Sequence, residues 1–174
     1  MKRIVLAGGG TAGHIEPALA VARELRHRYP HCEITLLGTE SGLETRLVPD
    51  AGFDLALISK VKVARSLSPS LLLLPFTLLR SITQSVQILR KADALVGFGG
   101  YVSGPAYCAA ALTRTPIVIH EANARPGLAN RLGAHLTSFT AITHPVQKGS
   151  LSGALISGLP LREDIVSAYR AASG

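Results

Sequence analysis

The sequence predicts an α/β domain in which helices cover both faces of a doubly wound parallel sheet, and three observations support this fold class. Short apolar runs of strand length alternate with longer segments of helical periodicity along the whole chain. The first run, residues 4–7, leads through Gly8-Gly9-Gly10 into a helical pattern, as in Rossmann-like folds. The chain has 174 residues, of which 47% are hydrophobic, so it can bury the core of one ordinary domain.

The expected strands are apolar and nearly continuous, because strands of a parallel sheet are buried on both faces. They are residues 3–7, 33–38, 54–58, 94–98, 116–120, 137–142 and 154–157. Helices are expected between them, at residues 16–29, 42–49, 69–91, 104–114, 126–135 and 161–171. In the third of these helices Leu78, Ile82, Val86 and Leu89 recur at helical spacing, so we expect all four in the core.

The turn after the first strand predicts an anion site. Backbone N–H groups and the positive end of a helix dipole converge at such a turn, which suits a phosphorylated ligand. The same dipole favours a neutral imidazole at His14, which can then accept a proton. Gly8, Gly10 and Gly13 also satisfy G-x-G-x-x-G, but an NAD-type site needs an acid after the second strand, where Glu40 is the candidate. A turn without any ligand is the remaining alternative.

Two later loops also follow expected strands, and the carboxyl ends of parallel strands share one edge of the sheet. Residues 98–105 repeat the order of strand, small residues and helix start, with Ser103 as the expected N-cap and Pro105 in the first turn. Residues 120–127 carry Glu121, a candidate base, partner of His14 or ligand of a sugar hydroxyl, and Asn123, which can donate and accept hydrogen bonds. We expect the three loops to form one site.

The formal net charge of +7 is compatible with nucleic acid, an anionic membrane or a phosphorylated ligand. Stacking residues are scarce, with no Trp, four Tyr and four Phe, so nucleic acid is not expected. No acidic residue lies between Asp54 and Asp93, where cations flank the leucines at 71–74. This pattern favours contact with a lipid surface, although another part of the same protein could cover the leucines. The residues expected at the membrane are Leu72, Leu73, Phe76, Lys60, Lys62, Arg65 and Arg80.

A cytoplasmic location is expected. The first residues run directly into a strand and so do not form a signal peptide, and no window has the roughly 18–20 uninterrupted apolar residues of a membrane span. Cys32 and Cys108 lack the spacing of metal ligands, which indicates reduced thiols.

The three loops, in this order, resemble the MurG family of peptidoglycan N-acetylglucosaminyltransferases. The matching stretches are Gly9–His14 with Pro17, Gly99–Pro105, His120–Asn123, and Gly158–Arg162 with Asp164. Three positions depart from the family pattern: Ala12 replaces a glycine, Ala122 a glutamine and Leu159 an asparagine.

The resemblance implies one half of a two-domain GT-B enzyme. Such an enzyme transfers N-acetylglucosamine from UDP-GlcNAc, with inversion, to the 4-hydroxyl of MurNAc in undecaprenyl-pyrophosphoryl-MurNAc-pentapeptide (lipid I). Residues 1–160 would be the N-terminal domain that binds the acceptor and the membrane, and residues 161–174 the start of the interdomain linker helix. The C-terminal donor-binding domain is absent from this sequence. The resemblance also implies a peripheral location on the inner face of the bacterial plasma membrane.

The resemblance further implies roles for individual residues. His14 is the first candidate for the base, with Glu121 as second candidate or as its electrostatic partner. The implied donor contacts are Thr11, Ala12, Gly13, Asn123 and Arg162. The implied contacts to the acceptor pyrophosphate are Gly9, Gly10, Gly99, Gly100, Tyr101 and Ser103. No cofactor or metal is implied, and the sequence contains no D-x-D. The alternatives are a binding module that is inactive alone and an NAD-type domain.

Overall fold

The computed structural model describes residues 1–61, 70–146 and 148–173. Two residues expected at the membrane, Lys62 and Arg65, lie outside the described residues, as does the side chain of Leu72.

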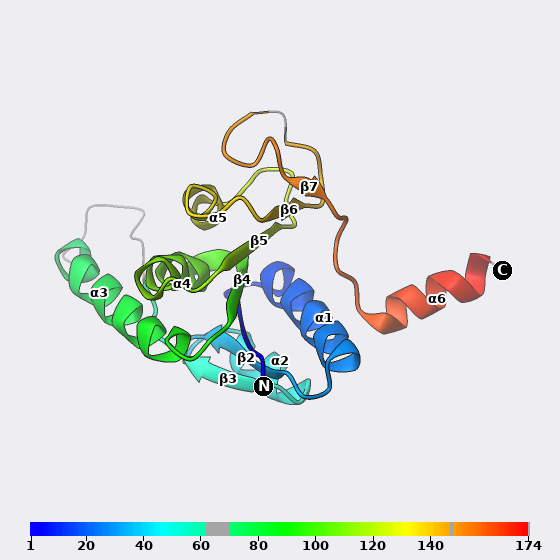
Figure 1. Cartoon of the computed structure of the whole chain (residues 1–174), viewed down its shortest axis with the longest axis horizontal. Helices are drawn as coiled ribbons and strands as arrows, with labels where there is room; N and C mark the ends of the chain where they lie inside the picture. The colour runs from blue at the N-terminus through cyan, green and yellow to red at the C-terminus, as the bar shows by residue number, and fades with distance from the viewer. Residues whose placement is uncertain (62–69, 147, 174) are drawn as a thin grey trace.

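Seven strands form one parallel sheet in the order β3-β2-β1-β4-β5-β6-β7 (Figure 1). The strands are β1 (Arg3–Gly8), β2 (Glu33–Gly38), β3 (Asp54–Leu57), β4 (Ala94–Gly99), β5 (Ile117–Glu121), β6 (Thr140–Ile142) and β7 (Leu155–Ile156). The helices are α1 (Ala12–Arg28), α2 (Glu44–Asp50), α3 (Ser70–Leu89), α4 (Gly100–Thr113), α5 (Leu128–Gly133) and α6 (Glu163–Ser173). The predicted doubly wound sheet is confirmed, and all seven expected strands form.

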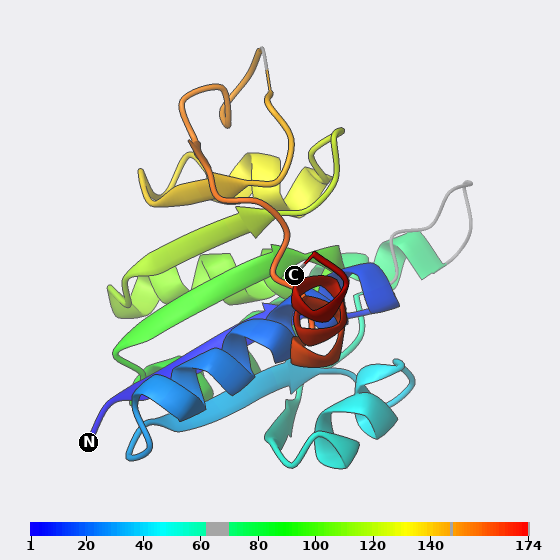
Figure 2. The same ribbon diagram turned by 90° about the vertical axis from the view of Figure 1, so that its right-hand side faces the viewer.

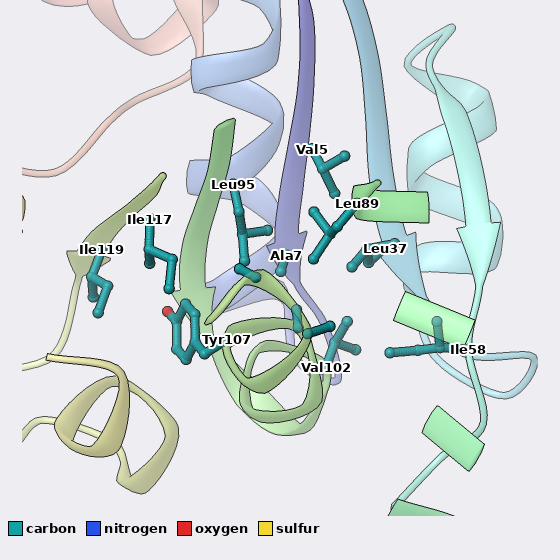
Figure 3. Packing of buried hydrophobic residues seen from close by; sticks show 13 residues of the cluster. Val5, Ala7, Leu37, Ile58, Leu89, Leu95, Val102, Tyr107, Ile117 and Ile119 are labelled. Atoms are coloured by element: carbon teal, nitrogen blue, oxygen red, sulfur yellow. The ribbon is translucent and has the colours of Figure 1, made fainter. Parts of the chain in front are cut away.

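Side chains alternate between two cores, one on each face of the sheet. Val5 and Ala7 point to the face covered by α3, α4 and α5, where Tyr107 and Leu95 are buried (Figure 3). Leu6, between them in the sequence, packs with the buried residues of α1 and α2 on the other face. This period of two is what a strand buried on both faces requires.

The chain reverses its winding direction between β1 and β4, which lie side by side in the centre of the sheet. Gly8 at the end of β1 is paired with Gly99 at the end of β4. The first two glycine turns are therefore neighbours at the switch point, the place where open parallel sheets bind their ligands.

The core prediction for α3 is only partly correct. Leu89 is buried and Ile82 and Val86 pack against the core, but Leu78 is 37% exposed. The first turns of α3 extend beyond the carboxyl ends of the strands, so that part of the helix has no sheet beneath it (Figure 2). At the other end of the chain, α6 lies apart from the sheet (Figure 1).

Candidate active site at the switch point of the sheet

His14 lies in the first turn of α1, between the two glycine turns. Thr11 is the N-cap residue of this helix, and its Oγ1 lies 3.0 Å from His14 Nδ1. The imidazole is half-buried and lies so close to the second glycine turn that a Cβ on Gly99 or Gly100 would be 3.2 Å from ring atoms. Thr11 thus fixes one ring nitrogen, and the glycines of the other turn leave room for the ring.

The two turns fit together only because glycine occupies the contact positions. Gly100 has a φ of +79°, and a Cβ there would overlap the carbonyl oxygen of Gly9. Gly10 has a φ of +93°, and a Cβ there would overlap the ring of Tyr101. Both positions therefore exclude larger residues, first by their backbone conformation and second by lack of space.

The second helix starts earlier than its sequence predicts. Gly99, not Ser103, is the N-cap of α4, so Pro105 lies beyond the first turn. Ser103 is 0% exposed, and its hydroxyl donates to the carbonyls of Ala7 and Gly99 and accepts from the N–H of Gly99. The Ser103 side chain is therefore enclosed and fully engaged with the protein backbone. Its hydroxyl ties the ends of β1 and β4 together.

Glu44, which the sequence did not mark, lies beneath the first glycine turn. Its Oε2 accepts a hydrogen bond from the backbone N–H of Gly10, at 3.2 Å, and its Oε1 accepts one from the N–H of Thr39, at 3.0 Å. One N–H of the predicted anion cradle is therefore already used by a carboxylate of the protein. The N–H groups of Ala12 and Gly13 remain, because the first turn of a helix has no internal acceptor for them.

Tyr101, predicted to contact the acceptor, points its hydroxyl inward. The hydroxyl donates to Glu44 Oε1 at 3.2 Å and lies 3.2 Å from Thr39 Oγ1. Burial is the main reason why the pKa of Tyr101 is raised, and nearby Glu44 adds to it. Lys60 Nζ lies 5.1 Å from the centre of the Tyr101 ring. The ring carbons of Tyr101, and not its hydroxyl, lie next to Gly10 in the first glycine turn.

Glu121 organises its own loop. It is 1% exposed, and Oε1 accepts hydrogen bonds from the backbone N–H and the side-chain Nδ2 of Asn123. Oε2 accepts from the N–H of Gly127 and from Nδ2 of Asn130. Both oxygens of Glu121 are therefore enclosed and occupied by donors from its own loop and from α5.

Asn130 is a second residue that the sequence did not mark. It is buried in α5, donates to the carbonyl of His120 and to Glu121, and accepts from the hydroxyl of Tyr107 at 2.7 Å. Burial raises the pKa of Tyr107 strongly. His120 Nε2 lies 2.9 Å from the carbonyl oxygen of Gly158, which connects β5 with the segment leading to α6.

The predicted donor contacts are only partly brought together. Thr11, Ala12 and Gly13 are exposed at the start of α1, and Asn123 is exposed on the loop that follows β5. Arg162 lies just before α6, where it forms an exposed ion pair with Asp164 at 3.1 Å. No described contact joins Arg162 to the glycine turns.

Two pockets of the molecule do not include the glycine turns or His14 among their lining residues. A pocket of about 640 Å³ lies at the opposite, amino-terminal edge of the sheet, lined by residues that include Leu25, Tyr29 and Cys32. A pocket of about 370 Å³ near α5 is bordered by Arg125, Arg131 and Lys148. Among the described residues, no three His, Cys, Asp or Glu side chains gather in a way that could hold a metal ion.

Among the residues expected at the membrane, Leu73, Phe76 and Arg80 are exposed, whereas Lys60 is half-buried. Phe76 is 71% and Leu73 64% exposed, and Leu79 and Arg80 are exposed beside them on α3. Lys60 instead lies against Tyr101, near the glycine turns. No helix within the described part of the chain is long and apolar enough to cross a bilayer.

Comparison with known proteins agrees with the fold and the motifs. The glycosyltransferase family 28 N-terminal domain matches residues 4–141. The UDP-N-acetylglucosamine–N-acetylmuramyl-(pentapeptide) pyrophosphoryl-undecaprenol N-acetylglucosamine transferase of Streptomyces avermitilis is 56% identical over 97% of this chain and 47% of its own length. The protein of the same name from Corynebacterium diphtheriae is 49% identical over 94% of this chain and 45% of its own length. The chain therefore spans about half the length of the curated relatives it matches.

Solved structures show the same relationship. The crystal structure of Acinetobacter baumannii MurG is 33% identical, covers 83% of this chain and 41% of its own, and has a TM-score of 0.70. The UDP-GlcNAc 2-epimerase of Neisseria meningitidis shares the fold, with a TM-score of 0.63 and 16% identity over 99% of this chain and 51% of its own. The matches to the transferases and to MurG confirm the resemblance to the MurG family, which argues against the NAD-type alternative. The chain belongs to glycosyltransferase family 28, and it spans the N-terminal domain of that family.

Proposed function

We propose that this chain is the acceptor half of an inverting N-acetylglucosaminyltransferase. The full enzyme transfers GlcNAc from UDP-GlcNAc to the 4-hydroxyl of MurNAc in lipid I. Residues 1–160 are the acceptor-binding domain, and residues 161–174 begin the linker to a donor-binding domain outside this sequence. The similarity to the N-acetylglucosamine transferases of Streptomyces avermitilis and Corynebacterium diphtheriae supports the reaction. The observation in this chain that carries the proposal is the placement of His14 between two glycine turns at the switch point.

His14 is the base of this reaction. Inversion in a single displacement requires a group that takes the proton from the attacking hydroxyl. When the N–H of His14 Nδ1 donates to Thr11 Oγ1, Nε2 is unprotonated and can take the proton of the attacking hydroxyl. The neighbouring Gly99 and Gly100 leave room for the ring because they have no Cβ. Glu121 supports this arrangement indirectly, because it shapes the neighbouring loop through Asn123, Gly127 and Asn130.

The two substrates contact different parts of this edge. The exposed first turn of α1, Thr11 to Gly13, and the exposed Asn123 face the donor. The turn at Gly99 and Gly100 faces the acceptor pyrophosphate, and the start of each helix supplies N–H groups to an anion. Arg162 joins the donor side only if the segment before α6 moves, since its ion pair with Asp164 holds it at the start of that helix.

The test is His14→Ala in a protein that joins this chain to a donor domain. A positioned base contributes roughly 10²–10⁴ in rate, so kcat should fall by about that factor. His27→Ala is the matched control, because His27 is exposed at the other end of the same helix. If the His14 variant keeps the turnover of the control, His14 is not the base.

A binding module without activity of its own is the state we propose for the isolated chain, because half of the transition-state contacts are missing. An NMR titration with a short-chain, water-soluble analogue of lipid I should shift the amide resonances of Gly99 and Gly100. UDP-GlcNAc and NAD are the parallel titrants. Shifts with NAD alone would contradict the assignment to a glycosyltransferase half.

The exposed apolar side of α3 is the membrane contact, which makes the protein peripheral on the inner face of the plasma membrane. Leu73, Phe76 and Leu79 present apolar surface beside Arg80, as interfacial helices do. Phe76→Ser with Leu79→Ser should reduce binding to vesicles that contain phosphatidylglycerol. Leu112→Ser changes an equally exposed leucine on α4 and is the control. Equal binding by both variants would mean that another protein segment covers this side of α3.

A further inference from the structure

Glu44 is a fully buried acid that the proposed reaction does not use. It lies in the first turn of α2 and is 0% exposed. An acid in the first turn of a helix is usually solvated, where it interacts favourably with the helix dipole. An acid that is withdrawn from water instead needs hydrogen-bond partners to offset its lost hydration.

The partners of Glu44 come from three segments far apart in the sequence. Oε1 accepts from the N–H of Thr39 at 3.0 Å, from the Thr39 hydroxyl at 3.3 Å and from the Tyr101 hydroxyl at 3.2 Å. Oε2 accepts from the N–H of Gly10 at 3.2 Å. One carboxylate thus joins the turn after β1, the end of β2 and the start of α4.

These contacts form a continuous path to the base. Gly10 packs on the ring of Tyr101, and the carbonyl of Gly9 packs against Gly100. A Cβ on Gly100 would lie 3.2 Å from Nδ1 of His14, so Gly100 is a close neighbour of the imidazole. A change in the position of Gly10 therefore moves surfaces that contact His14 directly.

We propose that Glu44 is a positioning residue that holds Gly10 and Tyr101 so that His14 stays in place between the two glycine turns. It also prevents a ligand phosphate from using the N–H of Gly10, because Oε2 already occupies that donor. Anions at this turn are left to the N–H groups at the start of α1. The kinetic consequence rests on the proposed function, whereas the structural consequence rests on the hydrogen bonds alone.

The test is Glu44→Gln, which keeps the size of the side chain but replaces one acceptor oxygen by a donor. Val48→Ala is the matched control, because Val48 is equally buried in α2 but belongs to the hydrophobic core around Leu6 and Ile15. Spectra and activities of the two variants are compared at temperatures that lie equally far below their melting temperatures. In the 174-residue chain, Glu44→Gln should shift the amide resonance of Gly10 and the ring resonances of His14, and Val48→Ala should shift neither.

In a protein with the donor domain, Glu44→Gln should lower kcat by about tenfold to a hundredfold, as expected when a catalytic group is displaced by a fraction of an ångström. The KM for UDP-GlcNAc should change less. Val48→Ala should keep both constants near those of the unsubstituted protein. If both variants lower kcat equally, the role of Glu44 is only structural and the proposal is overturned.

The NMR resonances of the His14 ring show whether Glu44 positions His14, and they do so without a measurement of turnover. If they are the same in Glu44→Gln as in the unsubstituted chain, Glu44 does not position His14. If they shift but the unsubstituted two-domain protein transfers no GlcNAc, the proposed function fails and the positioning stands. Thr39→Val is a second variant for the case in which Glu44→Gln folds poorly. It removes one donor to Oε1 and should shift the same resonances by a smaller amount.

Discussion

Two buried carboxylates support the loops around His14. They differ in how far away along the sequence their hydrogen-bond partners lie. Glu121 binds Asn123, Gly127 and Asn130, all within nine residues of itself, and so shapes one loop. Glu44 binds Gly10, which is 34 residues away, and Tyr101, which is 57 residues away. The first organises local structure, whereas the second fixes how distant segments lie against each other.

Because their partners differ in this way, Glu121 should control the structure of one loop, whereas Glu44 should control the distances between separate turns. Loss of a local organiser should loosen one loop and leave the rest of the site in place. Loss of a long-range organiser should keep each turn intact but change the distances between them. Hydrogen exchange distinguishes the two roles, because it shows which backbone N–H groups lose protection when an acid or a residue that packs beside it is substituted.

The largest effect is expected from Glu121→Ala. It leaves four buried or partly buried donors without their acceptor, and the free energy of unfolding should fall by about 3–5 kcal/mol. Urea unfolding measures the loss. Hydrogen exchange should then be faster at Asn123 and Gly127, while Gly10 keeps its protection through Glu44.

Glu40→Ala is the control for Glu121→Ala, because Glu40 is exposed after β2 and should change stability by less than about 0.5 kcal/mol. Faster exchange at Gly10 to the same degree as at Asn123 would contradict the local role of Glu121. The two carboxylates would then act as one unit.

A smaller effect is expected from Gly10→Ala, which acts on the long-range contact. The new Cβ would overlap the Tyr101 ring, and alanine is strained at a φ of +93°. Together these should cost about 2–4 kcal/mol. Gly104→Ala is the matched substitution, because nothing lies near its Cβ and helix α4 should gain about 0.5–1 kcal/mol. Equal changes of thermal stability in the two variants would show that Gly10 is not closely packed.

The sheet could be predicted from the sequence because its signals are local. Each buried strand is a short apolar run, and the glycine turns mark where strand and helix meet, so the seven expected strands all form. The exposure of Leu78 could not be predicted from the sequence. Helical spacing identifies the apolar face of a helix but not the point at which the helix passes the edge of the sheet.

The candidate site could be predicted only where chemistry and position coincide. His14 could be predicted because it stands at the start of a helix that follows a glycine-rich turn, and the turns meet because strands β1 and β4 are neighbours. Glu44 and Asn130 carry no sequence signal, since a helical acid or amide is usually solvated and only the tertiary fold buries them. The internal hydrogen bonds of Ser103 and Glu121 could not be predicted, because a sequence shows that a side chain is polar but not which groups it contacts.

The smallest effect is expected from Tyr107→Phe, which removes a single contact from the Glu121 network. Asn130 loses the donor to its Oδ1, and the free energy of unfolding should fall by about 1–2 kcal/mol at neutral pH. Burial raises the pKa of Tyr107, so the native state keeps its proton when the unfolded chain ionises near pH 10. Stability from this group is therefore present below about pH 10 and lost as the pH rises further.

Phenylalanine has no proton to lose, so the gap between the two proteins should narrow as urea unfolding is measured from about pH 9 to about pH 12, by at most about 1.4 kcal/mol per pH unit. The shifted Tyr101 is present in both proteins and cancels in the difference. If the difference in unfolding free energy between the two proteins stays constant over this range, Tyr107 ionises at the same pH in the folded protein as in the unfolded chain. The hydrogen bond from Tyr107 to Asn130 would then not depend on a raised pKa of Tyr107, and the local role of Glu121 would have to rest on Asn123 and Gly127 alone.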